Sequence, residues 1–194
     1  AKFVSSTSKT AEKTETQVKT LPGADDVKVT DWFYEDVAWA YQRNILKGYD
    51  AHNFRPNALT SNFAVILTLG RLDKAGFTSN DAVEVSNWAK SNGVWPSGIP
   101  FDAYAPLTRG ELAVILRNYL AYRGIKAQPS NATFSDADKM TEEQREAFQI
   151  LNEAGIFRGD RTAAMLPQNH LNRAHLAALL HRLSEYIIKT ESER

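Results

Sequence analysis

The sequence predicts a mainly α-helical fold made of three tandem helix–loop–helix repeats. Two observations support this. Apolar residues recur at three- and four-residue steps over long segments, which is the periodicity of an amphipathic helix. Three of these segments share the same opening, and each follows a shorter helical segment and a glycine-containing loop. The 194-residue chain is 43% hydrophobic and 24% charged, an ordinary composition for a globular protein.

The clearest helix follows Pro106. Its apolar stripe consists of Leu112, Ile115, Leu116, Tyr119 and Leu120. Thr108 precedes Glu111 by three residues, the spacing of a capping box, and Gly124 stands where a C-terminal cap is expected. These signals predict a helix that begins just after Thr108.

The opening of this helix recurs twice. The three segments are ALTSNFAVILTLGRL from residue 58, PLTRGELAVILRNYL from residue 106 and HLNRAHLAALLHRLSEYI from residue 170. A glycine loop precedes each one, at Gly48, Gly98 and Gly159. Shorter helices are expected before these loops, at about 33–44, 79–92 and 141–154. The repeating unit is therefore an extended entry, a helix, a loop and a second helix.

These units give the expected domain organisation. We expect a flexible polar leader at 1–24, because this stretch has too few large apolar residues to offset the entropy of ordering. The repeats span 25–76, 77–126 and 127–190. Since two helices cannot bury an apolar stripe alone, we expect one compact unit, pseudo-threefold around a central bundle of the three second helices. A linear solenoid is the alternative.

Composition and motifs argue against several functions. The formal net charge is zero, so the sequence lacks the basic footprint of a nucleic-acid binder. No apolar run approaches the ~20 residues of a membrane-inserting helix, and cysteine is absent. The spacing of His170, His175 and His181 does not stack imidazoles on one helix face, so we expect no metal site. Cofactor loops and catalytic motifs are also missing, which predicts a binding protein rather than an enzyme.

Two arginines stand at an unfavourable position. Arg109 and Arg173 each fall in the first turn of a predicted helix, where a cation faces the positive end of the helix dipole at a cost of roughly 0.3–1 kcal/mol. A bound anion would turn this cost into a gain, because free N–H groups at a helix start also attract anions. The repetition indicates that both arginines bind an anionic ligand.

The repeats resemble the S-layer homology domain. The resemblance is carried by DWFYEDVAWAYQRNILKGYDAHNFRPN, by LTRGELAVIL and by FSDAD, AGIFRGD and LNRAHLAALL, and it extends over about 26–188. It implies an extracellular protein of the bacterial cell wall or S-layer. The implied function is non-covalent anchoring to a secondary cell-wall polysaccharide, often one with ketal-linked pyruvate. Other S-layer or surface protein domains are possible further partners.

The family's Thr-Arg-Ala-Glu signature, whose arginine contacts the ligand in a groove between repeats, matches unevenly. The second repeat has Thr108-Arg109-Gly110-Glu111, and the third has Asn172-Arg173-Ala174-His175, with histidine in place of the acid. The first repeat has LTSNF, one residue short, with Thr60 or Ser61 in place of the arginine. Two working arginine motifs at most are therefore expected.

The remaining candidates surround these motifs. An arginine can grip a carboxylate with two parallel hydrogen bonds, glycine lets a backbone approach a ligand, and aromatic rings pack on sugar faces. The expected ligand-binding residues are Arg109, Arg173, Thr108, Asn172, Gly48, Gly98, Gly159, Trp95, Tyr49 and Phe157, with Glu111 supporting the site through its capping box. The loop aromatics could instead cover the ends of the helical core.

Other conspicuous residues are given structural roles. We expect Trp32, Trp39 and Trp88 to pack in the core or between repeats, and Asp31 and Asp136 to cap the first helices of their repeats. Two alternatives to wall anchoring remain at this stage. The chain could be a helical-repeat scaffold for protein interaction or self-assembly, or the accessory domain of a larger surface enzyme.

Overall fold

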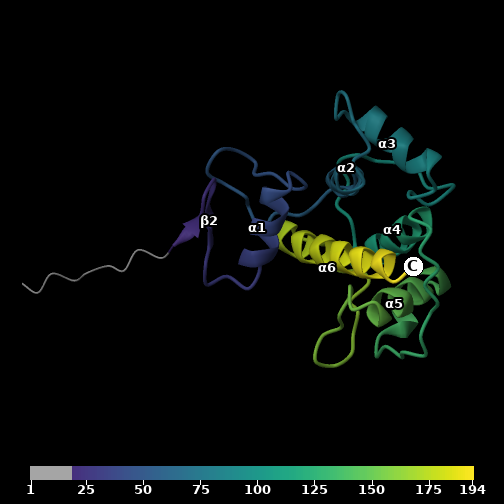
Figure 1. Ribbon diagram of the computed structural model, residues 1–194. Coiled ribbons are helices and arrows are strands. Elements are labelled where there is room, and N and C mark those ends of the chain that lie inside the picture. Colours follow the sequence, from purple (N-terminus) through teal and green to yellow (C-terminus); the bar gives the residue numbers. More distant parts are fainter. Residues whose placement is uncertain (1–18) are drawn as a thin grey trace, which may run out of the picture.

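The computed structural model describes residues 19–194 and is mainly helical, as the sequence predicts (Figure 1). Its elements in chain order are β1 (Thr20–Leu21), β2 (Ala24–Lys28), α1 (Tyr34–Gln42), α2 (Asn62–Leu72), α3 (Ala82–Ser91), α4 (Arg109–Tyr122), the 3-10 helix η1 (Ala137–Lys139), α5 (Glu142–Glu153) and α6 (Arg173–Ser192). None of the helices within 19–194 combines the length and apolar character that crossing a membrane requires.

A small hairpin begins the described part of the chain. β1 pairs with β2 in antiparallel orientation, and Gly23 in the turn has a φ of 81°, a conformation that glycine adopts without strain. Leu21, Ala24 and Val27 are buried. The expected flexible leader at 1–24 is therefore too long, because apolar residues of the hairpin join the core. Residues 1–18 of that leader lie outside the described residues.

Side chains cap most of the helices, and at α4 they do so in the way that the sequence predicts. Thr108 and Glu111 form a reciprocal capping box at the start of α4, and Ser61 and Asn172 accept hydrogen bonds from backbone N–H groups at the starts of α2 and α6. Asp31 caps no helix: α1 begins after Phe33 without a side-chain cap, and the Asp31 carboxylate accepts from the Lys28 N–H at 2.7 Å.

Asp136 also has a different role from the predicted cap. It is buried, and its two carboxylate oxygens accept hydrogen bonds from the backbone N–H groups of Met165 and Leu166 at 3.0 and 2.8 Å. Asp26 does the same for the N–H groups of Phe54 and Arg55. These carboxylates tie the loop after each first helix to the segment before that helix, which a local capping argument misses.

The helices pack across the repeat boundaries rather than within them. The most extensive pairings join α1 with α6, α2 with α3, and α4 with α5. Each first helix therefore lies against the second helix of the preceding repeat, and the first repeat closes onto the last. Figure 1 shows the long α6 between α1 on one side and α4 and α5 on the other. Among the three second helices, α2 and α6 are the pair in appreciable contact, so the expected central bundle is looser than these outer pairs.

The starts of the three second helices meet in a closed ring of backbone hydrogen bonds. The Thr60 N–H donates to the Leu171 carbonyl at 2.9 Å, the Leu171 N–H to Leu107 at 3.1 Å, and the Leu107 N–H to Thr60 at 3.1 Å. Each of these residues directly precedes a helix N-cap. The N-caps Ser61, Thr108 and Asn172 therefore occupy corresponding positions, each directly after a residue of the ring.

Candidate functional site

The backbone N–H groups at the helix starts are already hydrogen-bonded. At α4, the Arg109 N–H donates to the Asn169 carbonyl at 2.9 Å and the Gly110 N–H to Pro167 at 2.9 Å. The next N–H, that of Glu111, donates to the Thr108 hydroxyl. The expectation that free amides at the helix starts hold an anion is therefore wrong for α4, because the neighbouring loop supplies their acceptors.

The start of α6 has the same arrangement. The Arg173 N–H donates to the Ala58 carbonyl at 3.0 Å, the Ala174 N–H to Pro56 at 3.0 Å, and the His175 N–H to the Asn172 side chain at 2.9 Å. Asn172 and Thr108 thus act as helix caps, and Glu111 acts as the predicted supporting residue. Any ligand contact at these helix starts must come from the arginine side chains.

Arg173 is buried, with an exposed fraction of 7%. Its Nε donates to the Phe54 carbonyl at 2.8 Å and its Nη2 to the Lys47 carbonyl at 2.6 Å. The guanidinium lies over the rings of Phe54 and Tyr49, at 4.6 and 4.9 Å from their centroids. Desolvation lowers the pKa of this arginine. The loop of the first repeat therefore encloses Arg173 on several sides.

Tyr49 covers Arg173. Its ring is 55% exposed and has the Arg55 guanidinium 4.5 Å from its centroid, while Arg173 lies 4.9 Å from that centroid. Two guanidiniums therefore lie over the ring of Tyr49, which was expected to stack on a sugar. Gly48 beside it leaves no space for a Cβ atom, which would lie 2.6 Å from the Tyr41 hydroxyl and 2.8 Å from the Asp50 carbonyl. Gly48 is needed for this close loop packing.

Arg109 has related contacts but is more open. Its Nε donates to the Met165 carbonyl at 2.7 Å, and its Nη2 donates to the Arg158 carbonyl at 3.4 Å. Its guanidinium lies 5.1 Å from the centroid of Phe157, whose ring is fully buried. The Phe157 ring therefore packs against the Arg109 guanidinium on its buried side. Because this ring is buried, it does not make the expected contact with a sugar. Arg109 itself is only partly buried and faces a groove.

This Arg109 groove has a volume of about 230 Å³ and combines parts of all three proposed repeats. Its lining consists of Trp32, Arg109, Phe157, Arg158, Gly159, Asp160, Leu166, His175, Ala178, Leu179 and Arg182. The lining contains three arginines and one carboxylate. Gly159 belongs to the loop at its edge, where a Cβ atom would lie 3.2 Å from the Ala164 carbonyl.

The charges in the Arg109 groove perturb one another. Desolvation lowers the pKa of Arg182, and the nearby charge of Arg158 lowers it further. Desolvation and the charges of Arg109 and Arg182 lower the pKa of His175. Asp160 offsets only part of this repulsion, because it supplies a single negative charge to several cations. Hydrogen bonds from Thr162 and Ala164 in its own loop lower its pKa and so favour its ionised form. The groove has an excess of positive charge.

Trp32 is an exposed aromatic residue of this groove. Its side chain is 60% exposed, and its ring lies 5.2 Å from that of His175. Trp32 therefore lies outside the core, at a contact between the first and third expected repeats, which is the other place expected for it. Trp39 is buried as expected, and Trp88 packs partly buried against the core. An indole face beside several cations is a surface on which a sugar ring with an acidic group can pack.

The first repeat places Asn62 at the arginine position. Ser61 is the N-cap of α2, so Asn62 corresponds to Arg109 and Arg173. The expected placement of Thr60 or Ser61 at this position was off by one or two residues. Asn62 is buried, and its Nδ2 donates to the Asp102 carbonyl at 2.7 Å. The groove that Asn62 lines therefore has no guanidinium at the position that corresponds to Arg109 and Arg173.

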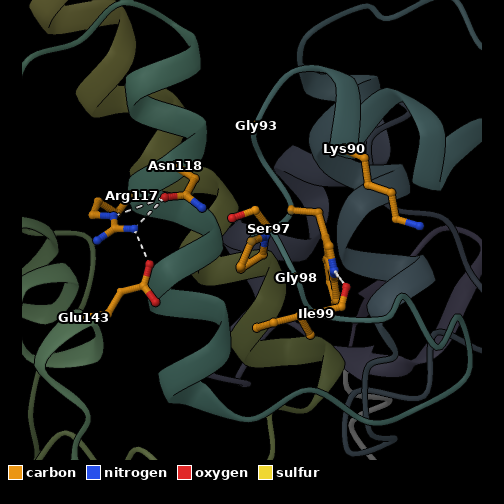
Figure 2. Close-up of a pocket in the computed structure, with 10 residues that line it drawn as sticks. Lys90, Gly93, Ser97, Gly98, Ile99, Arg117, Asn118 and Glu143 are labelled. Carbon is orange, nitrogen blue, oxygen red and sulfur yellow. Dashed lines mark hydrogen bonds and ion pairs between the residues drawn. The ribbon is translucent and has the colours of Figure 1, made fainter.

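That second groove, the Trp95 groove, has two adjoining parts of about 440 and 530 Å³, which share Trp95, Pro96, Ile99 and Glu143. Figure 2 shows the larger part, where Arg117 contacts Asn118 and Glu143. Trp95 is only 6% exposed, and its indole N–H donates to the Ile99 carbonyl at 2.9 Å. Trp95 thus offers little of its ring to a ligand.

The loop of the Trp95 groove contains the third expected glycine. Gly98 has a φ of 78°, and no atom lies within 4 Å of its Cβ position. Gly98 is therefore required for the turn of the loop rather than for close packing. Of the expected residues, the structure brings Arg109, Phe157 and Gly159 together in one groove.

The aromatic and basic residues of the Arg109 groove that sequence reasoning missed are Trp32, Arg158, His175 and Arg182. Two signals could have found some of them. His175 departs from the acidic residue of the motif, and on a helix the positions 175, 178, 179 and 182 lie on one face. The exposure of Trp32 has no such signal, because it depends on how the first repeat meets the third.

The comparisons with known proteins identify one family. The family model for the S-layer homology domain matches residues 25–61, from the hairpin through α1 and the following loop to the cap of α2. Within this segment the chain is therefore similar to an S-layer homology domain. No curated protein matches the chain.

This similarity supports anchoring to the bacterial cell wall in general. S-layer homology domains are binding modules rather than enzymes, they bind cell-wall polymers, and they indicate association with the cell surface or S-layer. Among residues 19–194, no group of three or more histidine or acidic side chains is placed to hold a metal ion.

Proposed function

We propose that the chain anchors its protein to the cell wall by binding an anionic group of a secondary cell-wall polysaccharide in the Arg109 groove. The observation that supports this most is the combination of Arg109, Arg158 and Arg182 with a single carboxylate, Asp160, in one groove. The charge of Arg158 lowers the pKa of Arg182, and the charges of Arg109 and Arg182 lower that of His175, which indicates repulsion among these groups. A bound carboxylate or phosphate would relieve it.

The side chain of Arg109 is suited to this role. A guanidinium has five N–H donors, and the loop carbonyls of Met165 and Arg158 accept from its Nε and Nη2 only. The remaining donors are available for a ligand, while the two loop bonds and the Phe157 ring fix the orientation of the group. A fixed guanidinium pairs with a planar carboxylate at low entropic cost, as in the pyruvate ketal that the family resemblance implies.

Trp32 would supply the sugar contact. Its exposed indole stands beside His175 at the edge of the groove. Charge-assisted hydrogen bonds contribute roughly 1.5–3 kcal/mol each, so two of them with stacking on Trp32 are consistent with micromolar binding, about 8 kcal/mol. Arg173 in this proposal holds the loop of the first repeat and does not contact the ligand.

The test must separate binding from folding. Arg109 and Arg173 both hold loops, so we choose the double substitution Arg158→Gln with Arg182→Gln, whose side chains make at most one long hydrogen bond to the backbone, from Arg182 to Ile156 at 3.4 Å. The matched control is Arg161→Gln, an exposed cation in the same loop that does not line the groove. Trp32→Ala tests the sugar contact separately.

The expected result is loss of co-sedimentation with purified cell-wall sacculi for the double substitution and for Trp32→Ala, with unchanged helical circular dichroism and normal binding by the control. A pyruvylated disaccharide should raise the melting temperature of the unsubstituted chain, because a ligand that binds only the folded state stabilises it. If all variants sediment equally, the Arg109 groove is not the binding site. Partner binding that ignores wall polymer would instead favour a protein-interaction scaffold.

A further inference from the structure

A second positively charged pocket lies at the opposite ends of the second helices. It has a volume of about 430 Å³ and forms where α1, α2 and α4 end beside the last turns of α6. Its lining consists of Arg43, Ile45, Arg71, Leu72, Lys74, Arg123, Ser184, Ile187, Ile188 and Glu191. We call it the helix-end pocket. It shares no residue with the Arg109 groove.

The helix-end pocket has four cations and one carboxylate in its lining. Arg123 is neutralised, because it pairs with Asp73 at 3.4 Å and with Glu191 at 2.5 Å. Within residues 19–194, Arg43, Arg71 and Lys74 have no carboxylate within 4.0 Å. Since the whole chain has a formal net charge of zero, three uncompensated cations around one hollow are a marked local excess.

Two of these cations are held in place without an acidic partner. Arg71 is partly buried and donates to the Ile45 carbonyl at 3.3 Å, and desolvation lowers its pKa. Arg43 lies over the Trp39 ring, 5.4 Å from its centroid. Desolvating a guanidinium costs free energy unless an opposite charge compensates. No described residue supplies that opposite charge to Arg71, so an anion from outside the chain would supply it.

Helix dipoles explain part of this arrangement. A cation near a helix C-terminus gains about 0.3–1 kcal/mol when exposed, which accounts for single basic residues at the ends of α1, α2 and α4. It does not account for their convergence on a hollow with apolar walls, formed by Ile45, Leu72 and Ile187. Apolar walls with a few convergent polar groups are typical of ligand sites.

We propose that the helix-end pocket binds an oxyanion, a phosphate or carboxylate group of a partner molecule, independently of the Arg109 groove. Arg43, Arg71 and Lys74 supply the positive charge. Arginine forks hydrogen-bond the oxygens of either group, and the exposed Lys74 closes the outer edge as a flexible point charge.

The experiment is a titration of the ¹⁵N-labelled full chain, followed by NMR, with inorganic phosphate and with citrate at constant ionic strength. Saturable shifts of backbone signals near Arg43, Lys74 and Ser184 are expected with at least one of them. Saturation by phosphate alone assigns a phosphate group, and saturation by citrate alone assigns a carboxylate. Shifts that neither anion saturates, or that sodium chloride reproduces, would overturn the proposal.

Substitutions locate the effect. Arg43→Gln and Lys74→Gln change exposed side chains, and each should weaken the apparent affinity roughly three- to fivefold, the effect of one partly exposed charge contact. Lys28→Gln, an equal charge change on the exposed hairpin, should have no effect, and Arg43→Lys should retain most of the binding. In the groove variant Arg158→Gln with Arg182→Gln, the shifts near Arg43, Lys74 and Ser184 should saturate with unchanged affinity. Equal affinity in every variant would place the anion elsewhere and refute the helix-end site.

Discussion

The substitution Arg173→Gln should destabilise the fold without changing wall binding. Arg173 donates two charge-assisted hydrogen bonds to the loop carbonyls of Phe54 and Lys47 and stacks on two rings. Bonds of this kind contribute about 1.5–3 kcal/mol each, and glutamine can replace at most one of them. The substitution also removes the cost of burying a cation, which offsets part of the loss. We expect a net destabilisation of about 2–3 kcal/mol.

Thermal unfolding followed by circular dichroism measures this effect. For a chain of this size, 1 kcal/mol corresponds to about 2–4 °C in melting temperature, so the midpoint should fall by about 8 °C. Co-sedimentation with sacculi, measured well below that midpoint, should equal that of the unsubstituted chain. A variant that keeps its melting temperature but no longer binds sacculi would show that Arg173 contacts the ligand, and the assignment of Arg173 as a loop support would then be wrong.

Three further substitutions or conditions test other parts of the structure. Thr108→Ala removes the hydroxyl of the α4 capping box and should cost about 1 kcal/mol in urea unfolding, with the same m-value. Gly70→Ala, a substitution within α2, would place a methyl group against the Phe77 ring and should cost about 1–3 kcal/mol by the same measurement. In Gly93→Ala no atom lies near the added Cβ, so any loss of stability in that variant comes from the left-handed backbone conformation of residue 93 alone. Desolvation first, and then Arg109 and Arg182, lower the pKa of His175 below its usual 6.5. The unfolded chain therefore binds this proton more readily, so the contribution of His175 should favour folding fully above pH 6.5 and decline as the pH falls through that range. An anion in the Arg109 groove should raise the pKa of His175, which an NMR titration with and without ligand would detect, and an unchanged pKa would argue against an anion there.

The helices and their starts could be predicted from the sequence because their signals are local. Apolar periodicity and capping residues lie within a few positions of each other, so the start of α4 after Thr108 followed directly. The pairing of the helices could not be predicted in the same way. The sequence suggests that neighbouring helices form a unit, whereas α1 packs on α6 at the other end of the chain. Contacts between residues so far apart in the sequence produce no periodic pattern in it.

The candidate site was predictable only in part. The repeated cation led directly to Arg109, but the same reasoning ranked Arg173 as equal to it. It also assumed free amides at the helix starts, which the loop carbonyls of Asn169, Pro167, Ala58 and Pro56 in fact occupy. Trp32 joined the groove through tertiary packing, so no motif around Arg109 could have indicated it.

The different surroundings of Arg109 and Arg173 come from the residue that follows the loop glycine. In the first repeat Gly48 is followed by Tyr49, whose ring stacks on Arg173 and closes the space above it. In the third repeat Gly159 is followed by Asp160, a shorter side chain that hydrogen-bonds within its own loop and leaves Arg109 facing a groove. Tyr49→Asp should therefore expose Arg173 and create a second anion-binding groove. Increased retention of that variant on wall polymer would show that one loop side chain decides whether a guanidinium supports the fold or binds a ligand, and unchanged retention would show that further walls of the Arg109 groove, such as Trp32, are also required.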